Sequence, residues 1–411
     1  MTQNNARILI IGGGFGGLFT ALELAGAGEV TLVNDEDHFL FKPMLYEYLS
    51  GEVEAWHIAP DCKELLDNKV HFIRGVVAKV DFDARQVTLA DRAEALSYDV
   101  LVVAPGAVTN YAGVEGAEQF THPFRTLNDA NRLRRRMTEA LDHVQPDAAP
   151  QDTRSALTFA VVGGGASGVE LSTKMADLLR DAVKRRDLRG EPRVLIIEMA
   201  DRLVPGMGEE LRNFVEGALE ECRVETHTQT RVVRVSDRSI TLEHNNAQTE
   251  LETAAVVWVA GVRMSPLAES LPVEKDRRGL ILVERTLQLR GHPNVFALGD
   301  VAFYPDVVPT LAGTAQLALQ ESGLCARNVR AFIEGRELKA RSFVELGEAV
   351  SLGTEHAAVL SAGQVIGGPL ARQARFAMYT ARLPTWHHRL RVGASWFFEG
   401  TSPRPLQPLG Y

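Results

Sequence analysis

Two copies of one glycine pattern, each set between a strand-like and a helix-like segment, constrain this chain more than any other feature of its sequence. The first copy follows the apolar run at residues 7–11 (RILII) and opens a segment with helical spacing at residues 15–25, after which a second apolar run covers residues 30–33. The same order returns from Leu157 and ends in the apolar run at residues 193–198. Each copy is typical of a β-α-β unit, so we predict an α/β protein with two Rossmann-like, doubly wound domains. The glycines of the two copies are Gly12, Gly14 and Gly17, and Gly163, Gly165 and Gly168.

The spacing Gly-x-Gly-x-x-Gly at the head of a helix suits the pyrophosphate of a dinucleotide. The first glycine permits a tight turn, the second lets the pyrophosphate approach the backbone, and the third lets the helix pack on the strand, while the helix N-terminus attracts the anion. The alternative is a pair of glycine-rich turns that serve packing only. Because both copies occur in the full strand-turn-helix context, we predict two dinucleotide-binding sites.

The residue at the end of the strand that follows each turn distinguishes the two sites. A carboxylate at this position binds a pair of ribose hydroxyls. In the second copy the residue is Glu198, whose charge favours NADH over NADPH, although Arg202 nearby leaves NADPH open. In the first copy it is Asn34, followed by Asp35, so the usual carboxylate is displaced by one residue or replaced by an amide.

Composition excludes several classes of function. The chain has 411 residues, of which 45% are hydrophobic and 24% charged, as in a globular protein of two or three domains. A formal charge of −9 argues against nucleic acid as a partner, because phosphate binding normally requires a basic surface. The three cysteines are far apart and include no Cys-x-x-Cys, so we interpret them as small core residues. No run of 18 apolar residues occurs, so we expect no membrane-spanning helix, and no motif calls for a metal.

Six segments spread along the chain carry motifs: the two glycine turns, two strand-to-glycine crossovers, a late Gly-Asp turn and a helix with an AQ-x-A-x-Q pattern. In chain order these segments are GGGFGGL (12–18), VVAPG (102–106), GGGASGVEL (163–171), VWVAG (257–261), ALGD (297–300) and AQLALQE (315–321). On these motifs the chain resembles, over nearly its whole length, the type II NAD(P)H:quinone oxidoreductases. The resemblance implies FAD in the first site and NADH or NADPH in the second. It implies cofactor-binding roles for Gly12, Gly14, Phe15, Gly16, Gly17, Asn34, Asp35, Lys42, Val77, Gly106, Asp300, Ala315, Gly163, Gly165, Gly168, Glu198 and Gly261.

The resemblance also implies three catalytic residues, which are Glu170, Gln316 and Gln320. The two glutamines lie four residues apart and share one helix face, and in the family this segment lines the quinone site beside the flavin. Glu170 is expected in the first turn of the helix that opens at the second glycine turn, and in the family it lies near the nicotinamide and the flavin. From the residues alone, the alternatives are two solvated glutamines and a glutamate favoured by the helix dipole. Because quinone reduction consumes two protons, the expected donor is Glu170 or a water held by the glutamines.

Two further segments indicate the branch of the family and the surroundings in which the protein works. Residues 39–60 resemble the cyanobacterial and plastid branch of the family, which is associated with demethylphylloquinone reduction in vitamin K1 synthesis. Lys42 in this segment either approaches the flavin or is a solvated surface charge. Residues 371–398 mix arginines with aromatic side chains, which suits an anionic membrane surface; a homodimer interface is the alternative. We therefore expect a cytoplasmic protein attached peripherally to the cytoplasmic or thylakoid membrane.

The predicted FAD domain comprises residues 1–120 and 276–345, the NAD(P)H domain residues 121–275, and a C-terminal membrane-association or dimerisation element residues 346–411. The predicted function is hydride transfer from NAD(P)H to FAD and transfer of two electrons to a membrane quinone, either demethylphylloquinone or a respiratory quinone. A soluble reductase of a protein electron carrier would lack the AQ-x-A-x-Q helix and the aromatic tail. A non-catalytic redox sensor that binds NADH would share these sequence features, so only an activity assay distinguishes it from the enzyme. A sulfide:quinone reductase would require reactive cysteines near the flavin.

Overall fold

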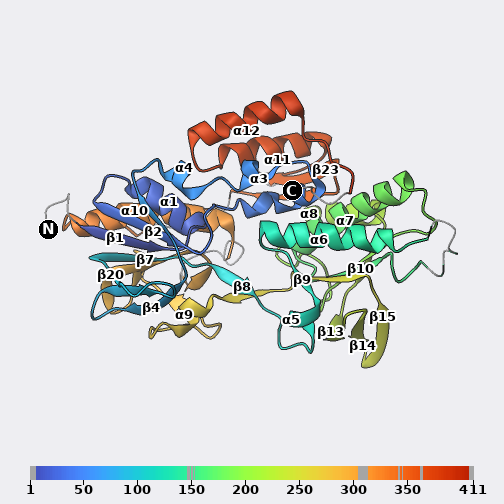
Figure 1. Ribbon diagram of the computed structural model, residues 1–411, viewed down its shortest axis with the longest axis horizontal. Helices are drawn as coiled ribbons and strands as arrows, with labels where there is room; N and C mark the ends of the chain where they lie inside the picture. Colours follow the sequence, from blue (N-terminus) through green and yellow to red (C-terminus); the bar gives the residue numbers. More distant parts are fainter. Residues whose placement is uncertain are drawn as a thin grey trace. The chain divides into compact units, whose positions relative to one another are not determined.

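The computed structural model describes residues 6–145, 149, 151, 153–303, 313–340, 343–344, 346–361 and 364–406 (Figure 1). Contacts divide the chain into two compact units, each made of three separate stretches. Unit 1 comprises Met1–Phe41, Ala59–Val108 and Val262–Leu346, and unit 2 comprises Lys42–Ile58, Thr109–Gly261 and Gly347–Tyr411. The bounds of the two units differ from those of the predicted domains. Residues 42–58, 109–120 and 347–411 group with unit 2, and residues 262–275 group with unit 1.

Unit 1 contains a six-stranded sheet in which β19 pairs antiparallel with β20 and all other neighbours are parallel. Helices α1 and α10 pack against each other. The sheet order is β19 (Gln288–Leu289), β20 (His292–Ala297), β7 (Val100–Val103), β1 (Arg7–Ile11), β2 (Glu29–Asn34) and β3 (His71–Arg74). Other elements of unit 1 are α1 (Phe15–Leu24), α4 (Cys62–Leu66), β4 (Val77–Asp81), β5 (Gln86–Leu89), β6 (Leu96–Ser97), β17 (Val262–Met264), α9 (Pro266–Ser270), β18 (Ile281–Leu282), η2 (Gly299–Val301), β21 (Ala302–Phe303) and α10 (Ala315–Ile333). Strand β8 (Ala107–Thr109) begins in unit 1 and ends in unit 2.

The central strands of unit 1 are apolar on both faces. β7 is buried along its whole length, and β1 is buried from its second residue onward. This is the expected burial of parallel strands that are covered on both faces, and it explains why RILII appears in the sequence as a continuous apolar run. Ile10, Leu101 and Phe296, from three neighbouring strands, have no exposed surface and form part of this core.

Unit 2 contains a five-stranded parallel sheet, an antiparallel hairpin layer and a C-terminal three-stranded sheet with two helices. The parallel order is β12 (Val224–His227), β11 (Arg193–Ile197), β10 (Thr158–Val162), β16 (Ala255–Trp258) and β9 (His122–Pro123). The antiparallel strands are β13 (Thr230–Val235), β14 (Ser239–His244) and β15 (Ala247–Glu252), and β22 (Glu348–Leu352), β23 (His356–Ser361) and β24 (Gln364–Gly368). The helices are η1 (Lys42–Met44), α2 (Leu45–Ser50), α3 (Ala55–Ile58), α5 (Ala117–Phe120), α6 (Leu127–Asp142), α7 (Ala166–Arg185), α8 (Glu209–Glu221), α11 (Pro369–Ala381) and α12 (Trp386–Glu399).

The predicted fold class, with two doubly wound parallel sheets, is confirmed. The predicted strand at residues 7–11 is β1, and the predicted helix at residues 15–25 is α1. The internal repeat is equally clear in unit 2, where β10, α7 and β11 follow one another around the second glycine turn. No helix in the described part of the chain is both long and apolar enough to cross a membrane.

Candidate active site

Predicted flavin-binding residues from distant parts of the sequence meet at one edge of the unit 1 sheet. The carboxyl ends of parallel strands lie at the same edge, and backbone hydrogen bonds continue the ladder past them. Gly12 N donates to Val33 O at 2.8 Å, and Ala104 N donates to Ile11 O at 2.8 Å. Asp300 follows β20 in the same way, in the 3-10 turn η2. The first glycine turn, the crossover ending in Gly106 and the Gly-Asp turn therefore form one edge site.

The first glycine turn has the steric properties that a pyrophosphate cradle requires. A Cβ atom at Gly12 would lie 2.2 Å from Ala104 O, and one at Gly17 would lie 1.8 Å from Gly12 O, so both positions require glycine. A Cβ atom at Gly14 would meet no atom within 4 Å, so the backbone there faces open space. Gly14 is also the N-cap of α1 and provides no side-chain cap, which leaves the helix N–H groups available to an anion.

The second glycine turn, in unit 2, repeats this arrangement. A Cβ atom at Gly163 would lie 2.8 Å from Ala260 N, and one at Gly168 would lie 1.8 Å from Gly163 O. A Cβ atom at Gly165 would again meet nothing within 4 Å, and α7 begins there without a side-chain cap. The crossover ending in Gly261 follows β16, the parallel neighbour of β10, and therefore belongs to the same carboxyl edge. Both cradles fit a dinucleotide.

The two strand-end residues occupy equivalent positions in the two units. Asn34 Oδ1 accepts a hydrogen bond from Gly13 N at 2.7 Å, and Glu198 Oε2 accepts one from Gly164 N at 2.6 Å. Asp35 does not share this position, because its Oδ1 accepts from Glu36 N instead. The sequence leaves open whether the carboxylate is displaced by one residue to Asp35 or replaced by the amide of Asn34. The hydrogen bonds match the second alternative. Ribose binding by Asn34 or Glu198 stays a prediction.

The two glutamines of α10 bind a neighbouring backbone segment. Gln320 Nε2 donates to Val344 O at 2.8 Å, and Gln320 Oε1 accepts from Val344 N at 3.1 Å. Gln316 Oε1 accepts from Leu346 N at 3.3 Å. Both side chains are half-buried, so they are not simply solvated, and they do share a helix face. The structure thus provides a structural role for the pair, and their contact with quinone stays a prediction.

One residue of this helix that sequence reasoning passed over is Glu321, the last letter of the AQLALQE segment. Glu321 Oε2 accepts a hydrogen bond from Gly299 N at 2.6 Å, so the glutamate stabilises the backbone of the Gly-Asp turn. Burial raises the pKa of Glu321 to about 8, against the hydrogen bond from Gly299, which lowers it. The Glu321 carboxyl group therefore binds its proton more tightly than an exposed glutamate does.

Glu170 lies in a buried charge network within unit 2, formed by six side chains of alternating sign. The helix α7 begins at Ala166, so Glu170 is its fifth residue and lies in the second turn, not the first as predicted. Glu170 Oε1 accepts hydrogen bonds from Arg375 Nη2 at 3.0 Å and from Ser351 N at 2.8 Å. The six residues of the buried charge network are Glu47, Glu52, Glu170, Lys174, Arg372 and Arg375.

The pKa values of the two carboxyl groups that contact Arg375 are shifted in opposite directions. Burial raises the pKa of Glu170 to about 7; Arg375 lowers that pKa and the negative charge of Glu47 raises it. Burial acts to raise the pKa of Glu47 too, but Arg375 and Lys174 outweigh it and hold that pKa below its usual value. Of these two carboxyl groups, Glu170 therefore binds a proton more readily, and pairs of carboxyl groups separated in this way are typical of acid-base sites.

The other predicted cofactor-binding residues have varied surroundings. Phe15 packs against Phe39 and Phe41, with ring centroids 5.1 Å and 5.4 Å away, so it contributes to the core of unit 1. Val77 opens β4, directly after the turn that follows β3, where Gly75 N donates to Asn34 O at 2.8 Å. Lys42 begins η1 and is exposed. All three assignments stay predictions.

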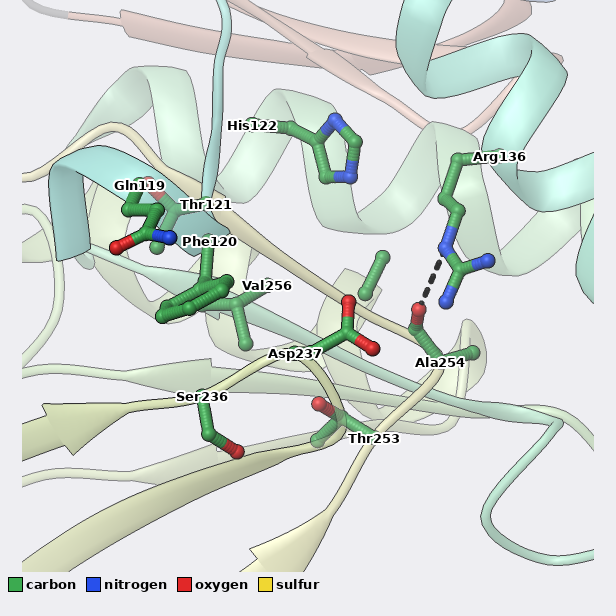
Figure 2. Close-up of a pocket in the computed structure, with 11 residues that line it drawn as sticks. Gln119, Phe120, Thr121, His122, Arg136, Ser236, Asp237, Thr253, Ala254 and Val256 are labelled. Atoms are coloured by element: carbon green, nitrogen blue, oxygen red, sulfur yellow. Dashed lines mark hydrogen bonds between the residues drawn. The ribbon is translucent and has the colours of Figure 1, made fainter. Parts of the chain in front are cut away.

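A polar cavity of about 300 Å³ in unit 2 lies away from the second glycine cradle. It is lined where β9 and β16 begin, so it belongs to the amino edge of the parallel sheet, whereas the cradle lies at the carboxyl edge. Figure 2 shows His122 and Arg136 on its wall, and Arg136 Nε donates to Ala254 O at 2.8 Å. Burial and the nearby charge of Arg136 lower the pKa of His122. This cavity and the second glycine cradle therefore lie at opposite edges of the same sheet.

Comparisons with known proteins agree with this geometry. Residues 6–321 match the family model described as pyridine nucleotide-disulphide oxidoreductase. The chain is 36% identical to the demethylphylloquinone reductase NdbB of Synechocystis sp., covering 96% of each chain, and 31% identical to the type II NADH:quinone oxidoreductase NdhA of Mycobacterium tuberculosis, covering 95% of this chain and 86% of the relative. A solved structure of NDH2 from Plasmodium falciparum shares the fold with a TM-score of 0.86 at 19% identity, covering 98% of this chain and 100% of that one. The chain therefore belongs to the type II NADH:quinone oxidoreductases, within the pyridine nucleotide-disulphide oxidoreductase family.

Proposed function

We propose that this enzyme takes a hydride from NADH through FAD and passes two electrons to a lipid quinone. The observation that carries the proposal is the pair of glycine cradles, each open over its middle glycine and each at the carboxyl edge of a parallel sheet. Bound FAD would supply the redox chemistry, accepting a hydride from the nicotinamide and delivering electrons to the quinone. The side chains of the protein bind and orient these groups, exclude water and supply protons.

We assign FAD to unit 1 and NADH to unit 2. The assignment to unit 1 is supported by the meeting of the first glycine turn with the crossover at Gly106 and with Asp300, as the family resemblance implies. The assignment of NADH is supported by Glu198, whose carboxylate lies against the second glycine turn through Gly164 N. A negative charge at this strand end disfavours the 2′-phosphate of NADPH.

Glu170 is the proton donor in this proposal. Reduction of a quinone to a quinol takes up two protons with the two electrons, and a general acid works best when its pKa lies near the working pH. The pKa of Glu170, about 7, meets this condition. Within the described residues only its Oε1 accepts hydrogen bonds, so Oε2 is the oxygen from which the proton would leave. For Gln316 and Gln320, which belong to unit 1, we propose contact with the quinone.

The quinone we propose is demethylphylloquinone or a similar naphthoquinone. The support is the 36% identity with the Synechocystis demethylphylloquinone reductase over 96% of both chains, together with the resemblance of residues 39–60 to that branch. A respiratory benzoquinone is the competing substrate. The ratio of kcat/KM for a menaquinone analogue to that for a ubiquinone analogue decides between them, and a ratio below one contradicts the naphthoquinone.

Helix α12 supports a membrane-facing surface at the C-terminus. Trp386, Leu390 and Phe397 recur at helical spacing and are 61%, 63% and 80% exposed, whereas His388 and Val392 on the other side of the helix are buried. An exposed apolar stripe beside arginines is typical of helices that lie in the headgroup region of a bilayer. Sedimentation with anionic vesicles, abolished by Leu390→Glu, is the expected result. Concentration-dependent dimerisation without vesicle binding would assign the stripe to a homodimer.

One experiment tests the central proposal. The purified protein should show a flavin spectrum, and anaerobic NADH should bleach it. Addition of a menaquinone analogue should then restore the oxidised spectrum. A folded wild-type protein that binds no flavin, or a reduced flavin that no quinone reoxidises, contradicts the proposal; the second result would favour the redox sensor.

A further inference from the structure

Glu170 shares its guanidinium partner with a second buried carboxylate. Arg375 Nη1 lies 2.7 Å from Glu47 Oε1, and Arg375 Nη2 lies 3.0 Å from Glu170 Oε1. We propose that Glu47 is a positioning residue that sets the proton affinity of Glu170, because Glu47 engages the guanidinium on which the ionised form of Glu170 depends. This inference rests on the proposed donor role of Glu170.

The contacts explain why Glu47 stays ionised while Glu170 exchanges its proton. Glu47 has two cationic partners, since Lys174 Nζ also lies 3.6 Å from its Oε1, and its side chain has no exposed surface. Glu170 has Arg375 as its one ion-pair partner within the described residues, and it is at the end of the buried charge network. A buried carboxylate with two partners loses more on protonation than one with a shared partner. The proton therefore goes to Glu170.

The two residues of the buried charge network farthest from Glu170 along its ion pairs, Glu52 and Arg372, hold Lys174 through its ion pair with Glu52. Lys174 Nζ forms a close ion pair with Glu52, and Glu52 Oε1 in turn accepts from Arg372 Nη2 at 2.6 Å. Three carboxylates and three cations are thus in balance when Glu170 is ionised. Removing the charge of Glu47 would leave Lys174 paired with Glu52 and would leave Arg375 to Glu170 alone.

The remaining groups around Glu170 do not compete for this role. From α2, Tyr46 faces it, and from α11, Tyr379; burial raises the pKa of both phenols, so both are neutral at working pH. Tyr379 also lies under the Arg375 guanidinium, with 4.7 Å between Cζ and the ring centroid. From β22 the neighbour is the Ser351 N–H, which does not titrate, and from its own helix it is Lys174. Glu47 is therefore the titratable neighbour whose charge opposes the ionisation of Glu170.

The test is the ionisation of Glu170 measured directly, without quinone. Infrared difference titration of the holoenzyme follows the C=O band of the protonated carboxyl group, and Glu170→Gln identifies which band belongs to Glu170. In Glu47→Gln, whose amide oxygen still accepts from Arg375, the midpoint should fall by at least about one pH unit, a tenfold loss of proton affinity worth about 1.4 kcal/mol. A midpoint within about 0.3 pH unit of wild type overturns the inference.

Glu52→Gln is the matched control, since it removes the same charge from the buried charge network at a residue that does not ion-pair with Arg375. Its midpoint should move by less than half as much, and an equal shift would overturn the specific role of Glu47. If Glu47→Gln does not fold, the double variant Glu47→Gln/Lys174→Met removes an opposite pair and keeps the buried charge balanced. Its midpoint should still fall, because Glu47 affects Glu170 more strongly than Lys174 does; an unchanged or raised midpoint would overturn the inference.

The rate of flavin reoxidation by a menaquinone analogue, measured against pH, separates this inference from the proposed function. If Glu170 is the donor, the midpoint of the rate profile should move with the infrared midpoint in Glu47→Gln. An infrared shift with an unmoved rate profile would support the role of Glu47 and contradict Glu170 as the donor. An unmoved infrared midpoint would overturn the role of Glu47, whatever the rates do.

Discussion

The glycine cradles and the buried charge network around Glu170 differ in what determines them. Each cradle is a few consecutive residues whose steric requirements are local, as the 1.8 Å approach of a Cβ at Gly17 to Gly12 O illustrates. The buried charge network joins Arg375 to Glu170, 205 residues away, and to Glu47, 328 residues away. Chemistry carried by a local backbone turn is visible in the sequence, whereas chemistry carried by side chains from distant helices depends on the assembled fold.

The largest expected effect is on cofactor binding, and it should differ between the two glycine cradles. Gly14→Val places a side chain in the open space above the first turn and should abolish FAD binding, whereas Gly165→Val does so above the second and should leave FAD bound. For Gly165→Val we expect NADH affinity to fall at least about tenfold, or ~1.4 kcal/mol. Flavin absorbance per chain and an anaerobic NADH titration measure the two results. The reverse pattern would exchange the two cofactor assignments.

A second, smaller effect tests the buried charge network. Arg375→Met removes a cation from between two buried carboxylates and, at a pH above the pKa of Glu170, should lower the free energy of unfolding by about 3–5 kcal/mol, because one uncompensated charge then stays buried. The matched control is Arg263→Met in unit 1, which breaks an equally close pair with Glu269 (2.9 Å) on the surface and should cost less than about 1 kcal/mol. Urea unfolding of the two variants measures the difference. Equal losses would mean that burial does not set the strength of the network.

The limits of sequence reasoning follow the same division. The α/β fold and both glycine turns follow from local patterns, and all are present. Glu170 was singled out only by resemblance, and its partners Arg375 and Glu47 were not identified, since nothing in spacing indicates which charges meet in three dimensions. Arg375 appeared in the sequence as one of several arginines for a membrane surface, yet it is 1% exposed. Its burial depends on the packing of α11, which no local pattern predicts.

The two strand-end residues, Glu198 and Asn34, should differ by about tenfold in their effect on the preference between NADH and NADPH. Glu198→Ser removes the carboxylate beside Gly164 N and should raise the kcat/KM for NADPH relative to NADH at least about tenfold, or ~1.4 kcal/mol. Asn34→Ser, at the equivalent position of unit 1, should leave this ratio unchanged, because that edge is assigned to FAD. Steady-state kinetics with both nucleotides measure the ratio. A wild-type enzyme that already prefers NADPH strongly would contradict the role given to Glu198.

The smallest expected effects concern the glutamines of α10, whose two interpretations predict different measurements. Gln320→Leu removes both hydrogen bonds to Val344, at 2.8 and 3.1 Å. Because a hydrogen bond contributes about 1 kcal/mol net, we expect a loss of about 1–2 kcal/mol in the free energy of unfolding. Chemical unfolding of the holoenzyme measures this loss, which a purely quinone-binding glutamine would not produce.

Gln316 has the weaker of the backbone contacts, at 3.3 Å from Leu346 N, and is therefore the better probe of the quinone. If its amide orients quinone or the protonating water, Gln316→Phe should leave flavin reduction by NADH nearly intact and slow reoxidation about fivefold, or ~1 kcal/mol. Stopped-flow absorbance times the two half-reactions separately, and the loss should be confined to kcat/KM for quinone. Equal slowing of both half-reactions, or loss of FAD, would mean that the glutamines serve only to hold Val344 and Leu346 against α10, and that proton delivery depends on Glu170 without them.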